Sequence, residues 1–559
     1  MASLAPLRFA FRPRLWGCLK GYRRADFAAD IGAGVTVGLV ALPLAMAFGI
    51  ASGVRPDQGI ATAIVGGLIV SLLGGSRVQI AGPAGAFVGL LYAIAEKYGV
   101  ANLLIATMMA GVLLFAMGAL RLGTLIRFIP ISIVIGFTTG IAIIIALSQV
   151  RDLLGLSIAK MPSNSFSQIA ALGENIHTTN WVAVTIGLSC LLMIVVWPAP
   201  HTARPGNWRF VTAKLPSTMV VLALSAFAVW ALELRVETIG SRFGSLPRGL
   251  PTPALPHFDW TSAQNLFGST VAIALLGAIE SLLCARVADG LIADRHDPNQ
   301  ELMAQGVANF VSPLFGGIAV TGTIARTMTN VKSGARSPVA GLIHSITLFL
   351  VILALAPLAG YIPLAALAAV LLWVAFNMAA WRELGELRQF SMFYRVILLS
   401  TLALTVIFDL TVAVEVGLVL SSLFFIYRIS SLTKVEALAL SPARSALPGG
   451  RRLGAWEVFG SIFFGSVTKL ENLLDPAKPL PDVVVLEMHK VINIDTTGLD
   501  ALESLLATLK RRGGRLILVD LNEQPLSLLA RSGFLEQLGR DNVFDDFEAA
   551  LDAAGATTS

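Results

Sequence analysis

Apolar segments follow one another for about 400 residues of this 559-residue chain, beginning near residue 27. Hydrophobic residues make up 55% of the sequence, charged residues only 14%, and the mean hydropathy is +0.75. Soluble domains carry roughly 25% charged residues. Most of the chain is therefore expected to lie in lipid, as a mostly helical membrane protein.

One apolar stretch, residues 315–327, does not read as a continuous helix. Its sequence is Phe-Gly-Gly-Ile-Ala-Val-Thr-Gly-Thr-Ile-Ala-Arg-Thr. We expect residues 318–320 to be extended, residues 321–323 to offer a capping hydroxyl and a flexible backbone, and a half-helix to begin at Ile324. A break at membrane depth is tolerated only where it is buried in protein or lines a cavity.

A second stretch, residues 75–86, has the same organisation. A short extended run at residues 78–80 is followed by Gly82 and Pro83, and Pro83 is well placed as the first helical residue. Two interrupted apolar segments in corresponding places of two halves indicate the binding site of a transporter.

These two breaks predict an anion site. The start of a half-helix presents free N–H groups and the positive end of the helix dipole, and Arg326 adds a full charge about one turn further on. The predicted substrate-binding residues are Gly82, Pro83, Ala84, Gly322, Thr323 and Arg326, with Ala45, Met46 and Phe48 from the first helix. Packing alone remains the alternative role for the glycines, for Met46 and for Phe48.

Glu280 is the carboxyl that stands out most, because residues 274–284 are otherwise apolar. A carboxyl group in a membrane span is costly, usually faces the bundle interior and often marks an ion or proton path. We predict that Glu280 couples transport to protons. The alternative is a structural ion pair with Arg286 or Arg326.

Other polar residues receive weaker predictions. We expect Asp289, Arg295 and Asp297 to form a loop network, and Asn309 to bond a neighbouring helix. Three distant cysteines without a CxxC pattern and six scattered histidines predict no disulfide framework, no metal and no cofactor. The net charge of +6 gives no reason to expect nucleic acid as a partner.

The membrane region reads as two repeats. We place them at about residues 26–238 and 260–429, joined by a proline-rich segment at 239–257. Pro43 lies 82 − 43 = 39 residues before Gly82, and Glu280 lies 321 − 280 = 41 residues before Thr321. Each repeat supplies about seven elements, and an odd number of crossings makes the repeats inverted.

Composition changes at about residue 430. Residues 430–559 show strands at 453–464, 483–488 and 516–519, and helices at 500–511, 527–532 and 543–554, which predicts a small soluble α/β domain. Asp495 or Thr496 is expected to cap the helix that follows. The basic leader, residues 1–25, predicts a cytoplasmic N-terminus, and an even number of spans returns the C-terminus to the same side.

The chain as a whole resembles the SulP (sulfate permease-like) family of anion transporters, and its tail resembles a STAS domain. The resemblance rests on residues 41–48, 75–77 with Gly82-Pro83, 278–281, 304–309, 321–326, 337–338 and 495–498. It implies fourteen spans in two inverted repeats of seven, a mobile core domain and a gate domain. It also implies a homodimer in the bacterial inner membrane with cytoplasmic STAS domains, and an anion site at residues 82–86 and 321–324.

Within the family the sequence looks closest to bacterial dicarboxylic acid transporters, through residues 277–284 and 377–378. Cys284 is a poor ligand for sodium, which prefers oxygen, so the resemblance implies proton-coupled uptake of fumarate, succinate or aspartate. Sulfate and bicarbonate are the alternatives within the family. An anion channel and a membrane signalling protein with STAS output, acting through a cytoplasmic protein partner, are the alternatives from other classes; we expect no enzyme.

Overall fold

The computed structural model forms two compact units, residues Met1–Leu418 and Val419–Ser559. It describes residues 11–124, 130–158, 161–162, 164–197, 216–256, 260–408, 410–441, 445, 447, 450–474 and 481–555.

The first half of the membrane unit contains seven spans or broken spans, with short helices beside them. The spans are α2 (Arg24–Ala51), α3 (Pro56–Ala61) continued by the π turn η1 (Thr62–Gly66) and α4 (Gly67–Leu73), β1 (Ala81–Gly82) with η2 (Gly85–Phe87) and α5 (Val88–Tyr98), α6 (Val100–Ala119), α7 (Ile131–Leu154), α9 (Trp181–Val196) and α11 (Ser217–Leu232). The short helices are α1 (Arg14–Leu19), α8 (Ser165–Glu174), η4 (Ile176–Thr178) and α12 (Ile239–Phe243).

The second half repeats this order. Its spans are α14 (Phe267–Ile292), α15 (Pro298–Val311) with η5 (Ser312–Phe315), β2 (Thr321–Gly322) with α16 (Ile324–Lys332), α17 (Val339–Ala359), α18 (Leu364–Met378), α20 (Met392–Ile407) and α21 (Leu410–Leu432). The short helices are α13 (Trp260–Asn265), α19 (Trp381–Gly385) and η6 (Leu387–Gln389). Among the described residues, six helices are long and apolar enough to cross a membrane alone.

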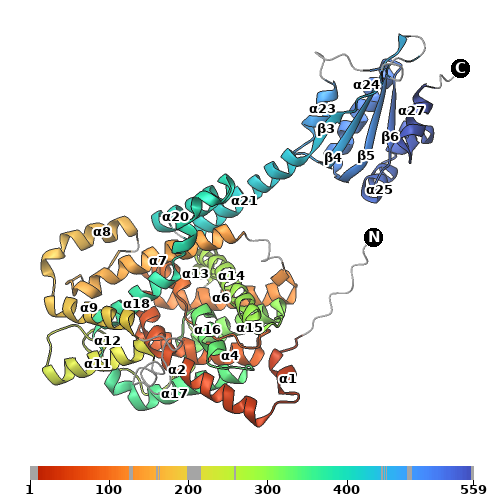
Figure 1. Ribbon diagram of the computed structural model, residues 1–559. Helices are drawn as coiled ribbons and strands as arrows, with labels where there is room; N and C mark the ends of the chain where they lie inside the picture. Colours follow the sequence, from red (N-terminus) through yellow and green to blue (C-terminus); the bar gives the residue numbers. More distant parts are fainter. Residues whose placement is uncertain are drawn as a thin grey trace. The chain divides into compact units, whose positions relative to one another are not determined.

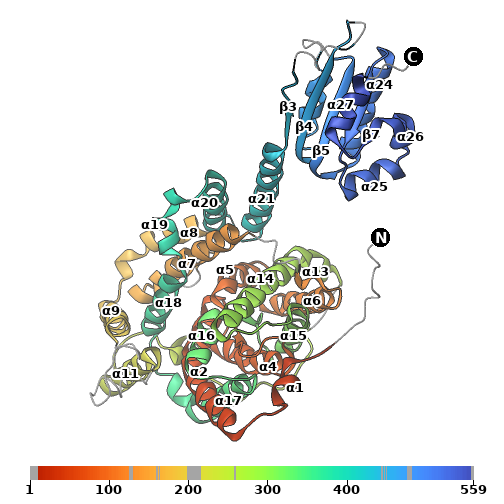
Figure 2. The same ribbon diagram turned by 45° about the vertical axis from the view of Figure 1, so that its right-hand side comes forward.

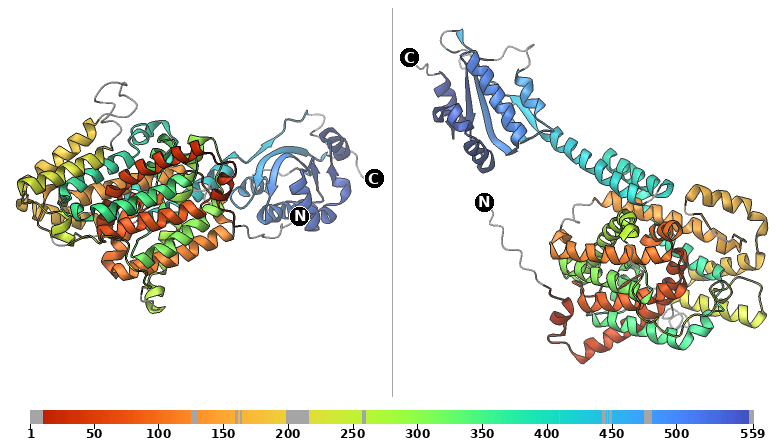
Figure 3. Two further views of the ribbon diagram at one scale, coloured as in Figure 1. Left: turned by 90° about the horizontal axis from the view of Figure 1, so that it is seen from below. Right: turned by 180° about the vertical axis from the view of Figure 1, so that it is seen from behind.

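The spans pack in two groups, which draw on both halves (Figure 1). The first helix group contains α2, α4, α5, α6, α14, α15, α16 and α17, where α6 packs on α15 and α2 on α17. The second helix group contains α7, α9, α11, α18 and α20, centred on α7 and α18. Figure 3 shows red and orange helices of the first half lying alongside green helices of the second half, as this mixing requires.

The two broken spans meet at the centre of the first helix group. Strand β1 pairs antiparallel with β2, Ala81 opposite Gly322 and Gly82 opposite Thr321. This register makes Gly82 and Gly322 equivalent under a two-fold rotation, as two repeats of opposite direction require. The predicted seven-plus-seven arrangement with two broken helices is therefore confirmed in its fold.

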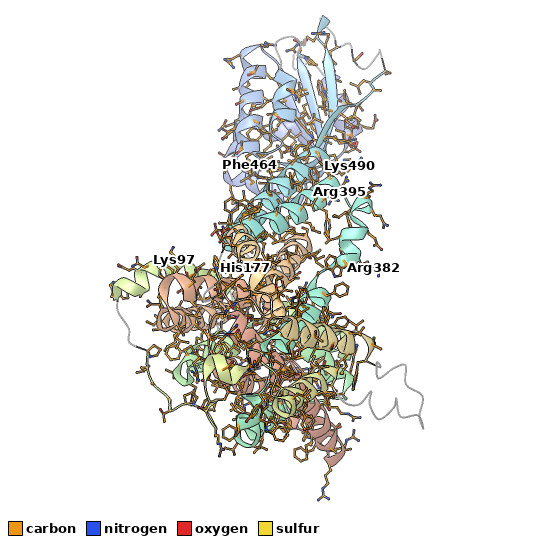
Figure 4. The ribbon with its side chains drawn as sticks, turned by 90° about the vertical axis from the view of Figure 1, so that its left-hand side faces the viewer. Lys97, His177, Arg382, Arg395, Phe464 and Lys490 are labelled. Carbon is orange, nitrogen blue, oxygen red and sulfur yellow. The ribbon has the colours of Figure 1, made fainter. Side chains whose placement is uncertain are left out.

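The C-terminal unit is a five-stranded sheet, shown with its helices in Figure 2. The strands lie in the order β3 (Lys434–Ala437), β4 (Leu453–Ile462), β5 (Val483–Ile494), β6 (Arg515–Val519) and β7 (Val543–Phe544), with only the β3–β4 pair antiparallel. One apolar core of this unit includes residues of four helices, α23 (Thr468–Glu471), α24 (Thr496–Arg511), α25 (Glu523–Arg531) and α26 (Phe534–Leu538). A second apolar core includes residues of α27 (Phe547–Gly555). The unit also contains the turns η8 (Asn472–Leu474) and η9 (Arg540–Asn542). Phe464, after β4, and Lys490, on β5, mark this unit in Figure 4.

Several predicted elements differ from the structure. Residues 543–544 form an edge strand, not the start of the last helix, because they pair with β6. Helix α8 is capped by the Asn164 side chain, which accepts from the N–H groups of residues 166 and 167. Asp495 caps α24 by accepting a hydrogen bond from the Gly498 N–H at 2.8 Å, as expected.

Candidate functional site: two half-helix starts and a buried arginine

The two broken spans are tied together by hydrogen bonds beyond the strand pair. The N–H and the hydroxyl of Thr323 both donate to the carbonyl of Ile80, at 2.9 and 3.0 Å. The N–H of Ile80 donates to the Thr327 hydroxyl at 3.0 Å. Thr323 thus precedes α16 without capping it by its side chain, contrary to expectation, because its hydroxyl is bound across the strand pair.

Two buried amide side chains support the extended residues from the side. Asn309, on α15, accepts from the Val320 N–H at 2.9 Å and donates to the Val320 carbonyl at 2.8 Å. Asn330, on α16, donates to the Val78 carbonyl at 2.8 Å. The role predicted for Asn309, a bond to a neighbouring helix, is replaced by support of the extended segment before β2.

Arg326 lies inside this arrangement and is only 1% exposed. Its Nη2 donates to the Pro83 carbonyl at 3.2 Å, and its Nη1 has no hydrogen-bond partner among the described residues. A Cβ atom added to Gly82 would lie 2.5 Å from Nη1. The guanidinium therefore occupies the space beside β1 that the missing side chain of Gly82 leaves.

Burying a cation without a partner is unfavourable, because the free energy lost when the charge leaves water is far larger than the free energy gained from its remaining contacts. No carboxylate lies within 4 Å of Arg326 among the described residues. The first turns of η2 and α16 present their backbone N–H groups on either side of the strand pair. The arrangement favours an anion at this point.

Gly322 faces away from this space. A Cβ added there would overlap the Gln79 side chain and lie 3.1 Å from Cys284 Cβ. Gln79 in turn donates to the Ser281 carbonyl at 3.3 Å, and the Gly322 N–H donates to the Ser281 hydroxyl at 3.3 Å. The absence of a side chain at Gly322 thus permits close packing of β2 on α14.

Glu280 lies on α14 and is 6% exposed. Among the described residues its carboxyl forms no hydrogen bond and no ion pair, so neither predicted structural pair, with Arg286 or with Arg326, is present. One turn earlier on α14, a Cβ at Gly277 would lie 3.5 Å from the Phe87 ring at the start of α5. Glu280 is therefore an unpaired carboxyl near the broken spans.

The remaining predicted residues occupy different environments. Ala84, not Pro83, is the residue that precedes the helical turn η2. A Cβ at Gly85 would lie 3.2 Å from Phe48 and 2.9 Å from Met378 Sδ, so the start of α5 meets α2 and the second helix group here. Ala45 instead packs against Gly59 of α3, and Met46 lines an apolar cavity.

Two glutamines that were not among the predicted site residues hold the loops before the two broken spans. Gln58 donates to the Gly316 carbonyl at 2.8 Å, and Gln300 donates to the Leu73 carbonyl at 2.6 Å. Both follow a helix-starting proline by two residues, Pro56 and Pro298. The repeated Pro-x-Gln pattern is the signal that would have revealed them.

The predicted loop network at Asp289, Arg295 and Asp297 is only partly formed. Asp289 accepts from the backbone and ring nitrogens of His296, at 3.1 and 2.7 Å, and Asp297 caps α15 through the N–H groups of residues 299 and 300. Only the backbone N–H of Arg295 takes part, donating to Asp294 at 2.8 Å.

Asp294 ties the N-terminal segment to this loop through its ion pair with Arg14, at 2.7 Å. Partial burial opposes ionisation of Asp294. The hydrogen bonds from Arg14 and from the Arg295 N–H outweigh it and hold the pKa of Asp294 below its ordinary value.

A larger cavity of about 960 Å³ separates the two helix groups at one end of the spans. Val88 and Tyr92 of α5 line it on one side, and Gln149 and Arg151 of α7 on the other. The cavity therefore reaches the first residue of α5, Val88.

The C-terminal unit contains a group of side chains that could hold a metal ion, although the sequence predicts no metal. There, ligand atoms of Glu457, Glu487 and His489 lie within 4.8 Å of one another. Glu457 pairs with Lys490 at 2.5 Å and Glu487 with His489 at 3.2 Å. Because the Glu457 carboxylate is already paired with Lys490, we assign no metal to this group.

Comparison with known proteins agrees with this geometry. Residues 27–401 match the model of the sulfate permease family, and residues 452–550 match the STAS domain. The chain belongs to the sulfate permease family. It is therefore a multi-pass membrane protein and an anion transporter with a C-terminal STAS domain, as the resemblance implied.

Curated relatives cover almost the full length of this sulfate permease family member. The putative sulfate transporter YvdB of Bacillus subtilis is 39% identical over 95% of this chain and 98% of its own. The bicarbonate transporter BicA of Picosynechococcus sp. is 28% identical over 86% of each chain. Dicarboxylate is not part of these names.

Solved structures show the same fold. The transmembrane domain of a cyanobacterial BicA has a TM-score of 0.63 at 30% identity, covering 70% of this chain and 98% of its own. Murine Slc26a9 in its inward-facing state has a TM-score of 0.86 at 18% identity, covering 100% of this chain and 96% of its own. The second likeness supports the fold alone.

Proposed function

We propose that this family member is a proton-coupled secondary transporter of doubly charged oxyanions, working by alternating access in the bacterial inner membrane. The observation that carries the proposal is Arg326, buried between two half-helix starts with Nη1 unpartnered. Each helix start carries about +0.5 charge, so with Arg326 about two positive charges converge on the site. A dianion matches this charge better than a monoanion does.

The proposed binding residues are the nine predicted from the sequence, with different tasks. Arg326 and the backbone of residues 82–86 and 323–326 contact the anion, and Phe48 closes the site. Gly322, Ala45 and Met46 act through packing. The first helix group is proposed as the moving core domain, and the second as the gate domain.

Sulfate, fumarate and succinate are dianions, whereas aspartate carries two carboxylates and one ammonium group, and a specific observation favours each class of substrate. Sulfate is favoured by the 39% identity to a putative sulfate transporter. Fumarate, succinate or aspartate is favoured by the resemblance of residues 277–284 to dicarboxylate transporters. Bicarbonate, named for a relative at 28% identity, carries one charge and ranks behind them.

The test is a substrate screen with purified protein in liposomes under an imposed pH gradient. We expect inward proton flux to drive accumulation of sulfate or succinate above the external concentration, with bicarbonate accumulated less. Equilibration without accumulation would identify an anion channel instead. Transport by homodimers, with both termini and the STAS domain on the cytoplasmic side, completes the proposal.

Proton coupling is assigned to Glu280, because its buried carboxyl has no partner among the described residues. We predict that Glu280→Gln abolishes proton-driven accumulation, because the amide cannot exchange a proton, while oxyanion binding measured by calorimetry changes less than about threefold. Accumulation by this variant at the wild-type level would contradict the assignment.

A further inference from the structure

An apolar cavity of about 410 Å³ lies between α2, α11 and α17. Its lining side chains are all apolar or aromatic, and they include Met46, Ala226, Phe227 and Ile352. Figure 1 shows α11 beside α2 and α17. The cavity thus lies between the first helix group, which contributes α2 and α17, and the second, which contributes α11.

The cavity opens on the surface that faces lipid. Phe227 and Trp230 of α11 are 61% and 58% exposed, and Leu358 of α17 is 61% exposed. Deeper in the cavity, Met46 and Ile352 are 1% and 5% exposed. Apolar cavities exclude water and accept apolar ligands. In the bilayer, the apolar molecule that reaches this opening is a lipid tail.

The length of the cavity matches one leaflet. Along α11 its lining runs from Met219 to Trp230, which lie 230 − 219 = 11 positions apart, or about 16 Å at 1.5 Å per residue. This is about half of the roughly 30 Å hydrocarbon core. Trp230 and Tyr361 lie at the same end, near the ends of α11 and α17, and such aromatic residues favour the membrane–water interface.

We propose that this cavity binds one acyl chain of a phospholipid, with the glycerol region at Trp230 and Tyr361 and the chain end near Met46. With the N-terminus in the cytoplasm, the lipid belongs to the outer leaflet. The acyl chain separates α11 from α2 at Met46. Phe48, two residues later on α2, contacts the start of α5. The presence of the acyl chain therefore sets how closely the two helix groups approach, and hence the transport rate; this consequence rests on the proposed function.

Binding is tested on the full-length protein in liposomes that contain a phospholipid with a diazirine near the end of one acyl chain. After illumination, we expect labelled peptides from residues 42–46, 219–230 and 351–362, which line the cavity. Ala226→Phe fills the cavity and should reduce this labelling at least fivefold. Ala228→Phe is the matched control, because Ala228 is equally half-buried on α11 but does not line the cavity.

Ala223→Phe, from a second lining position, provides an independent filling variant. Equal labelling of Ala226→Phe, Ala223→Phe and Ala228→Phe would overturn the proposal. So would wild-type labelling of these peptides no stronger than that of α9, which exposes Leu188 and Leu192.

Transport by the same variants tests the consequence. We expect the two filling variants to change the uptake rate at least threefold, while calorimetric oxyanion affinity stays as in the control. Lost labelling with an unchanged rate would overturn the link to transport. If the wild-type protein accumulates no oxyanion at all, the proposed function fails, and the labelling result still decides whether the acyl chain is bound.

Discussion

Arg326 shows how one side chain depends on the absence of another. The guanidinium fits beside β1 only because residue 82 is glycine, and it is held there by one hydrogen bond, to the Pro83 carbonyl. Its unpartnered Nη1 is the group that a bound oxyanion would satisfy. Charge-assisted hydrogen bonds of this kind contribute about 1.5–3 kcal/mol, which is about 10- to 150-fold in affinity.

We predict that Gly82→Ala weakens oxyanion binding by about tenfold or more, because the new Cβ lies 2.5 Å from Nη1 and must displace it. Gly89→Ala is the control on the same broken span, where the new Cβ meets Ile144 at an ordinary 3.7 Å. Calorimetry on purified protein provides the measurement. Equal affinities of the two variants would remove Arg326 from the site.

At the scale of elements, β1 and β2 are too short to be stable by themselves. Each contributes two residues, and their extended flanks leave backbone groups that lipid cannot satisfy. Side chains from α15 and α16, Asn309 and Asn330, supply the missing partners. The broken spans are thus a property of four elements packed together.

Asn309→Ala should therefore destabilise the protein by about 2 kcal/mol or more, since it leaves the buried N–H and carbonyl of Val320 unpaired. Asn102→Ala is the comparison, because the Asn102 amide, in the first turn of α6, donates only to the Tyr98 carbonyl at the end of α5. Thermal unfolding in detergent measures both. The prediction fails if the two variants unfold at the same temperature.

The contact between α1 and Asp294 should depend on pH. The pKa of Asp294 is lowered in the folded protein, so its ion pair with Arg14 stabilises this contact above the unfolded pKa of about 3.9. The contribution disappears as the pH falls through the lower, folded value. Both partners are partly exposed, so the stabilisation is small, at most about 1 kcal/mol.

We predict that the amides of residues 14–19 lose protection against hydrogen exchange, measured relative to the intrinsic exchange rate at each pH, as the pH falls below about 4 and Asp294 becomes protonated. Arg14→Gln should show low protection already at pH 7 and little further loss of protection on acidification. A pH response in Arg14→Gln as large as that of the wild type would assign the effect to another group.

At the scale of the molecule, the site depends on both repeats. Gly82 and Arg326 are separated by 326 − 82 = 244 residues, and each belongs to a different half. Gln58 of the first half likewise bonds to Gly316 of the second half, and Gln300 of the second half bonds to Leu73 of the first half. By contrast, every proposed binding residue precedes residue 327, so the C-terminal unit contributes none.

A chain that ends after Leu432 should consequently insert in the membrane and bind oxyanion with an affinity within about threefold of the full-length protein. Calorimetry on the purified fragment checks this, and uptake in liposomes shows whether transport also needs the STAS domain. Folded fragment without oxyanion binding would place part of the site in the C-terminal unit.

Much of the architecture follows from the sequence by itself. Apolar runs define the spans, because burial in lipid depends on local composition, and glycine or proline within such a run marks a break because it weakens a helix locally. The two broken spans, the α/β tail and the isolated Glu280 were found in this way. The family resemblance added the STAS domain, which the comparisons confirm.

Tertiary structure alone decided what each of these residues faces. Gly322 packs on α14 and Gly82 faces Arg326, although the two glycines have equivalent places in the repeats. Met46 lines the apolar cavity while Phe48, two residues later, meets the start of α5. Neighbours of this kind come from helices distant in sequence, so no local pattern encodes them; they follow from how the spans pack.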